Sequence, residues 1–175
     1  MRRGPLLLVL VVAVLATVAG VAVYQLQDKR TASSAHGAQM LFAARLPGMD
    51  GKPQAVSEWR GRVLVVNFWA TWCDPCREEI PTFIKLQNQY RDPGVLFVGI
   101  AVDQRDKVQA YAKEIGMNYP VLIGGLDSMD MARQLGNTKS VLPFTLVVDR
   151  KGDMVLSHYG AMSASQLEVA IKKQL

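Results

Sequence analysis

Cysteine is scarce in this chain: among 175 residues only Cys73 and Cys76 occur, three positions apart. With no other thiol present, any disulfide within the chain closes a very short loop. Closing so short a loop removes little conformational entropy from the unfolded chain, so the pair is poorly suited to stapling the fold. The scarcity favours a chemical role for the two cysteines, with a structural bridge as the alternative.

Histidine is equally scarce, and His36 and His158 stand at no ligand spacing from the cysteines. A tetrahedral zinc site takes four nitrogen, sulfur or oxygen ligands, so no metal site is expected. The sequence also lacks G-x-S-x-G and a glycine-rich loop after a strand, which leaves hydrolases and phosphate-binding proteins without support. We expect no cofactor other than a redox-active disulfide of Cys73 and Cys76.

A concentrated excess of charge is missing as well. The formal net charge is +5, and the residues Arg2, Arg3, Asp28, Lys29 and Arg30, which lie outside the part expected to fold, account for +3 of it. Charges of both signs are interspersed over the remainder, whereas a nucleic-acid-binding protein needs a concentrated basic face. No nucleic-acid partner is expected.

One long hydrophobic run is present, over residues 6–24, and it holds no charged residue. A helix rises about 1.5 Å per residue, so this run nearly spans a hydrocarbon core of about 30 Å. A cleaved signal peptide is the alternative, although its apolar core is usually about 7–15 residues long. We predict a transmembrane anchor, or uncleaved signal, over residues 1–27.

The remaining residues divide into a polar linker over 28–40 and a folded domain over 41–175. Arg2 and Arg3 favour a cytoplasmic amino terminus. We therefore expect a single-pass membrane protein with its domain on the extracytoplasmic side, which for a bacterial cytoplasmic membrane is the periplasmic side.

Strand and helix patterns alternate along the domain. Apolar runs predict strands over 63–69, 96–102 and 120–123, and helical spacing predicts helices from the cysteines to Tyr90, over 108–115 and over 128–135. A hairpin follows over 144–149 and 154–159, and a capping box of Ser163 and Gln166 opens a last helix. These units predict an α/β fold with a mixed β-sheet covered by helices on both faces.

The C-x-x-C pair is expected at the amino end of a helix, because Pro75 is tolerated in a first helical turn. Unpaired N–H groups and the helix dipole stabilise a thiolate there, which makes Cys73 the expected nucleophile. Cys76, nearly one turn later, can reach back to resolve a mixed disulfide. We expect Cys76 to be the more buried sulfur.

The segment VLVVNFWATWCDPC, residues 63–76, resembles the active-site strand and helix of thioredoxin-fold proteins. Followed by REEIP in an anchored chain, it is similar to the TlpA/ResA-like thiol–disulfide oxidoreductases. The resemblance implies a thioredoxin-like domain over about residues 41–175. In that family a cis-proline faces the nucleophilic sulfur, a role that falls on Pro143, and Trp72, Leu142 and Pro143 are the implied contacts for substrate.

Glu79 matches the active-site glutamate of the ResA-like branch. It stands three residues after Cys76, and burial there would raise its pKa and suit it to proton transfer. Thioredoxins proper carry an aspartate at the position of Asn67, which cannot titrate. The resemblance therefore assigns the proton role to Glu79, with a solvated surface charge as the alternative.

The resemblance implies a reductase for disulfides of exported proteins such as apocytochromes c, supplied with electrons by an integral membrane thiol carrier. A membrane-anchored copper metallochaperone of similar fold is the alternative. That class resembles C-x-x-x-C with a distant histidine, whereas here the spacing is one residue shorter and no histidine lies near Pro143 in the sequence.

Overall fold

The computed structural model describes residues 15–25, 36–92 and 94–175. Residues 15–25 are helical and exposed, while the rest of the expected anchor and most of the expected linker lie outside the described residues. Within the described ranges, no helix has both the length and the hydropathy to cross a membrane. The chain divides between residues 34 and 35, and the second unit holds the folded domain.

The folded domain begins earlier than the sequence predicts. Residues 36–43 are helical, although residues up to 40 were expected to form a polar linker. Ala38, Leu41 and Phe42 are buried, and their spacing places them on one side of a short helix. Polar residues such as Ser33, Ser34, His36 and Gln39 dominate the sequence around the start of this stripe and conceal it.

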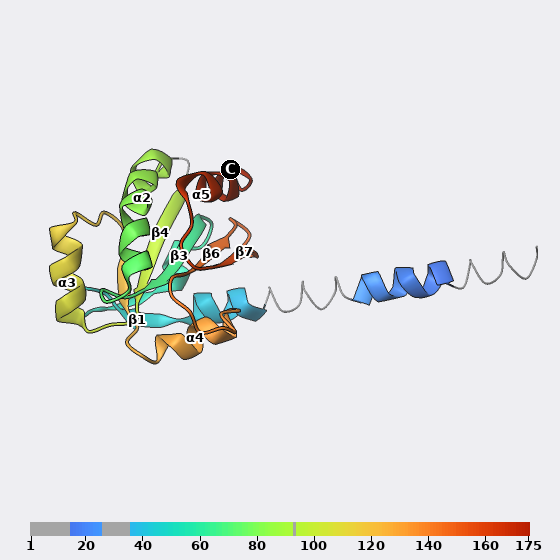
Figure 1. Ribbon diagram of the computed structural model, residues 1–175, viewed down its shortest axis with the longest axis horizontal. Helices are drawn as coiled ribbons and strands as arrows, with labels where there is room; N and C mark the ends of the chain where they lie inside the picture. The colour runs from blue at the N-terminus through green and yellow to red at the C-terminus, as the bar shows by residue number, and fades with distance from the viewer. Residues whose placement is uncertain (1–14, 26–35, 93) are drawn as a thin grey trace, which may run out of the picture. The chain divides into compact units, whose positions relative to one another are not determined.

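A five-stranded mixed sheet forms the centre of the domain, in the order β5-β4-β3-β6-β7 (Figure 1). Its strands are β3 (Val63–Trp69), β4 (Val95–Ala101), β5 (Val121–Ile123), β6 (Phe144–Val148) and β7 (Met154–Tyr159). β4 runs parallel to both β3 and β5, whereas β6 runs antiparallel to β3 and β7. The mixed sheet expected from the sequence is confirmed, and β3 at its centre is buried throughout.

Helices cover both faces of this sheet. The first face packs against α2 (Asp74–Tyr90), α3 (Arg105–Glu114) and α5 (Ala164–Lys172). The second face packs against α4 (Ser128–Gln134) and residues 36–43. α2 continues through Pro81, and the capping box of Ser163 and Gln166 opens α5 as expected.

Successive side chains of β3 point to opposite faces of the sheet, and this alternation determines which of them lie beneath α2. Val63, Val65 and Trp69 belong to the core under α2, whereas Leu64 and its alternate neighbours belong to the core under α4. Asn67 falls in the α2-facing register, so it places one polar side chain in an otherwise apolar row.

The sequence does not predict the small elements that precede β3. They are a two-stranded antiparallel hairpin of β1 (Arg45–Pro47) and β2 (Pro53–Ala55), followed by the 3-10 helix η1 (Val56–Trp59). These short elements also lack the continuous apolar run that marks β5, which is equally short.

Candidate active site

The two cysteines are joined by a disulfide at the amino end of α2, with their Cα atoms 5.3 Å apart. Cys73 is the residue immediately before the helix, and Pro75 occupies its first turn, as the sequence predicts. The Cys73 residue retains 6% exposure, whereas Cys76 is completely buried. An incoming sulfur can therefore approach the disulfide at Cys73.

The loop before Cys73 is held by a carboxylate at the end of β4. Asp103 accepts hydrogen bonds at Oδ2 from the backbone N–H and hydroxyl of Thr71, at 3.1 and 2.5 Å, and at Oδ1 from the Gln104 N–H, at 2.7 Å. Burial raises the pKa of Asp103, but these bonds and the charge of Lys107 outweigh burial and leave it below its ordinary value. Asp103 is thus suited to anchor the loop as an anion. No motif in the sequence points to this contact, because only the pairing of β3 with β4 brings Thr71 close to Asp103.

A groove of about 430 Å³ opens beside the disulfide. Its walls include Cys73, Trp72, Leu126, Met129 and Leu142. Trp72 and Leu126 are respectively 64% and 80% exposed, so apolar side chains project at the rim of the groove. An apolar segment of another polypeptide could bury them there.

Leu142 and Pro143 are joined by a cis peptide bond at the start of β6. Leu142 and Trp72 both line the groove. Pro143 is buried, and the groove-lining residue at this point is Leu142. The structure therefore brings Trp72 and Leu142 together at Cys73, and Pro143 follows Leu142 in the chain.

Glu79 lies on α2 one turn beyond Cys76, and only 4% of its surface is exposed. Its Oε1 accepts a hydrogen bond from Asn67 Nδ2, at 2.8 Å, and its Oε2 accepts one from the backbone N–H of Met162, at 3.0 Å. Burial raises the pKa of Glu79 to about 7, against the opposing effect of the two hydrogen bonds. Glu79 is therefore a buried carboxyl that can exchange a proton near neutral pH.

Asn67 is bonded on one side of its amide only. Nδ2 also donates to Thr145 Oγ1 on β6, at 3.0 Å, whereas Oδ1 has no partner among the described residues. Rotating the amide by half a turn would point Oδ1 at Glu79, where it could accept a hydrogen bond from the protonated carboxyl. Asn67 can thus serve both protonation states of Glu79 without carrying a charge.

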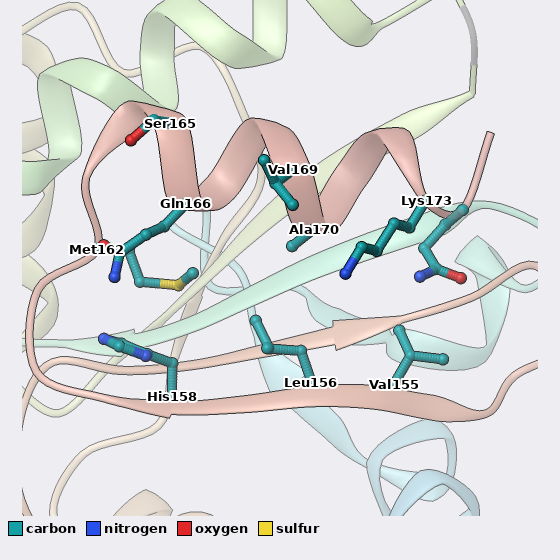
Figure 2. A pocket seen from close by; sticks show the side chains of 10 residues that line it. Val155, Leu156, His158, Met162, Ser165, Gln166, Val169, Ala170 and Lys173 are labelled. Atoms are coloured by element: carbon teal, nitrogen blue, oxygen red, sulfur yellow. The ribbon is translucent and has the colours of Figure 1, made fainter.

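A second groove, of about 420 Å³, lies between β7 and α5. Figure 2 shows Leu156 and His158 on the strand and Val169 and Lys173 on the helix around it, with Met162 at one end. Neither cysteine lines this groove. His158 lines this second groove, away from the cysteines. Among the described residues there is no cluster of three or more potential metal ligands.

Comparison with known proteins supports the chemistry of this site. The Redoxin family model matches residues 32–172. The thiol-disulfide oxidoreductase ResA of Bacillus thuringiensis (strain Al Hakam) is 30% identical over 128 residues, which cover 71% of this chain and 70% of the relative. The range matched by the Redoxin model includes both cysteines and all five strands of the central sheet.

Two solved structures have the same fold. A thiol:disulfide interchange protein of the thioredoxin family from Chlorobium tepidum TLS superposes with a TM-score of 0.68 at 31% identity, covering 75% of this chain and 92% of that one. A secreted thiol-disulfide isomerase from Corynebacterium glutamicum gives a TM-score of 0.68 at 25% identity, covering 75% and 83%. Both support the thioredoxin-like arrangement described above.

Proposed function

Because the chain belongs to the Redoxin family and is a ResA-like thiol–disulfide oxidoreductase, we propose that it reduces disulfides of exported proteins through Cys73 and Cys76. The observation that carries the proposal is the position of the disulfide. It stands at the amino end of α2, with Cys73 on an apolar groove and Cys76 buried behind it. That arrangement gives one sulfur access to a client and keeps the second for the resolving step.

The reaction starts from the reduced pair. The Cys73 thiolate attacks one sulfur of the client disulfide, a mixed disulfide forms, and the other client sulfur leaves as a thiolate that takes up a proton. Cys76 then loses its proton and attacks Sγ of Cys73. The second client sulfur leaves and is protonated, so two electrons and two protons pass to the client and the Cys73–Cys76 disulfide remains.

Glu79 is the proposed proton acceptor for Cys76. It lies one turn further along the same helix, and its pKa of about 7 suits it to accept a proton and release it again near neutral pH. Asn67 supports this role, because its amide can be bonded to either form of the carboxyl. Trp72, Leu142 and Pro143 are proposed to contact the client chain on either side of the exchanged sulfur.

We further propose that the domain works outside the cytoplasm, tethered by the anchor over residues 1–27. The charge-free run over 6–24 and the helical residues 15–25 support an anchor, and the Corynebacterium glutamicum protein is described as secreted. Electrons would come from an integral membrane thiol carrier, and oxidised apocytochromes c are the proposed clients. The comparisons do not favour the copper metallochaperone, because the similar proteins are named as oxidoreductases.

Covalent trapping in cells tests this function. Replacing Cys76 with alanine removes the resolving thiol, so mixed disulfides between Cys73 and its clients should accumulate in the membrane fraction and be released by reductant. Cys73→Ala/Cys76→Ala is the matched control and should trap nothing. A Cys76→Ala chain without any mixed disulfide, together with a wild-type pair that stays oxidised in strongly reducing glutathione buffer, would restore the structural-bridge alternative.

A further inference from the structure

The loop between α4 and β6 closes around one buried asparagine. Asn137 has no exposed surface, and its Nδ2 donates to the Val141 carbonyl oxygen, at 2.8 Å, while its Oδ1 accepts from the Val141 N–H, at 3.2 Å. Its backbone N–H donates to the Ala132 carbonyl oxygen, at 2.8 Å, and its carbonyl oxygen accepts from the Ser140 N–H, at 2.9 Å. The side-chain amide of Asn137 thus bonds both backbone groups of Val141, as a residue of a neighbouring strand would.

This bonding fixes a loop that the groove beside Cys73 depends on. Ser140 and Leu142 line the groove, and they flank the residue that Asn137 holds. Ser140 has a φ of 50°, in the left-handed region of backbone conformation. This conformation costs free energy for any residue other than glycine, so it persists only where the surrounding structure enforces it. Asn137 supplies that enforcement from inside the fold, without lining the groove itself.

We propose that Asn137 is a positioning residue for thiol–disulfide exchange: by holding Val141, it keeps Leu142 in place as the groove wall that a client polypeptide contacts at Cys73. The identity of the occupant rests on the proposed function, and the role of Asn137 adds to it. Sequence reasoning gave no indication of this role, because a lone asparagine after a helix reads as an ordinary loop residue.

Two substitutions separate positioning from simple stability. Asn137→Ala removes the hydrogen-bond partner of both backbone groups of Val141, which should release the loop. Asn137→Asp keeps the shape, but an ionised carboxylate repels the Val141 carbonyl oxygen. Once protonated, the same side chain can donate to that oxygen and still accept from the Val141 N–H. The aspartate variant should therefore recover as the pH falls through its pKa, which burial raises.

The measurement is single-turnover exchange of the reduced full-length chain in non-ionic detergent, followed by stopped flow. Insulin serves as a polypeptide substrate, and glutathione disulfide as a small one that contacts little of the wall. We expect Asn137→Ala to raise the insulin concentration for half-maximal rate by about tenfold or more, and to change the glutathione reaction much less. As the pH is lowered from about 8 to about 5, the half-maximal insulin concentration of Asn137→Asp should return toward the wild-type value measured at the same pH.

Asn118→Ala is the matched control. Its amide donates to the Ile84 carbonyl oxygen, at 3.0 Å, and to Asn88, at 2.8 Å, and none of these three residues lines the groove at Cys73. This variant should lose thermal stability without weakening insulin binding. Equal effects on both substrates, with no pH-dependent recovery of Asn137→Asp, would overturn the positioning role. A wild-type chain that reduces neither substrate would instead overturn the proposed function, and the positioning role with it.

Discussion

The side-chain amide of Asn67 donates a 2.8 Å hydrogen bond to Glu79, joining the central strand to the helix that carries Cys76. Thioredoxins, by the resemblance described above, have an aspartate at the strand position. In this chain the titratable group is on the helix, and the strand supplies a neutral partner. The proton-exchanging carboxyl therefore shares a rigid element with the cysteine it is proposed to serve.

Replacing Glu79 with glutamine should slow the resolving step and remove its inflection near pH 7, because the variant has no carboxyl to accept the Cys76 proton. General acid–base contributions suggest a loss of about a hundredfold. The decay of a preformed mixed disulfide, measured between about pH 5 and about pH 9, checks this expectation. Glu78→Gln is the control, since Glu78 is exposed. Equally small effects of both substitutions on the decay rate would show that Glu79 takes no part in proton transfer.

Glu79 should also make the oxidised protein less stable as the pH rises. Its pKa of about 7 in the folded protein lies above the ordinary glutamate value of 4.5, so the native state binds more protons than the unfolded state between these two pH values. The free energy of unfolding should fall by roughly 3 kcal/mol from this group as the pH rises through that window, and then level off. Urea titrations should show that Glu79→Gln abolishes the fall and Glu78→Gln preserves it. An unchanged slope in Glu79→Gln would contradict the burial effect.

Removing the Asn67 amide should move the pKa of Glu79 upward. Asn67→Ala deletes a hydrogen bond to the carboxylate and leaves burial less opposed, so the ionised form loses support. The carboxyl titration, followed by infrared difference spectroscopy, should have its midpoint about one unit higher than in wild type. Thr145→Val is the control, because it removes the second acceptor of Asn67 and leaves the bond to Glu79 in place. A midpoint that falls in Asn67→Ala would refute the assignment.

The two thiols should differ in reactivity once reduced. In Cys76→Ala the remaining Cys73 stands at the amino end of α2 with part of its surface exposed. The pH dependence of its alkylation by iodoacetamide should therefore show a thiol pKa below that of an ordinary cysteine. In Cys73→Ala the remaining Cys76 is buried and should react at least about tenfold more slowly at neutral pH. Faster alkylation of Cys76 would reverse the proposed roles of nucleophile and resolving thiol.

The features that the sequence predicts correctly are those marked by neighbouring residues, above all by apolar runs. The limits of β3 and the helix after Cys73 follow from an unbroken hydrophobic run and a proline in a first turn, and Glu79 follows from its spacing to Cys76 together with the family resemblance. The partners that set the chemistry of Glu79 lie far away in the chain. Met162 stands 83 positions from Glu79, and Thr145 stands 78 from Asn67. No periodicity carries that information, because only the folded sheet brings those residues together.

The hydrogen bond from the Met162 backbone to Glu79 also limits how this protein can be engineered. Met162 belongs to the short connection between β7 and α5, so the last helix fixes a group that faces the proton-exchanging carboxyl. An epitope inserted after Tyr159 or a chain shortened before Ala164 would each disturb that connection while leaving both cysteines intact. Tags and immobilisation points for this domain are better placed at the exposed turn between β6 and β7, which touches neither the disulfide groove nor the Glu79 network.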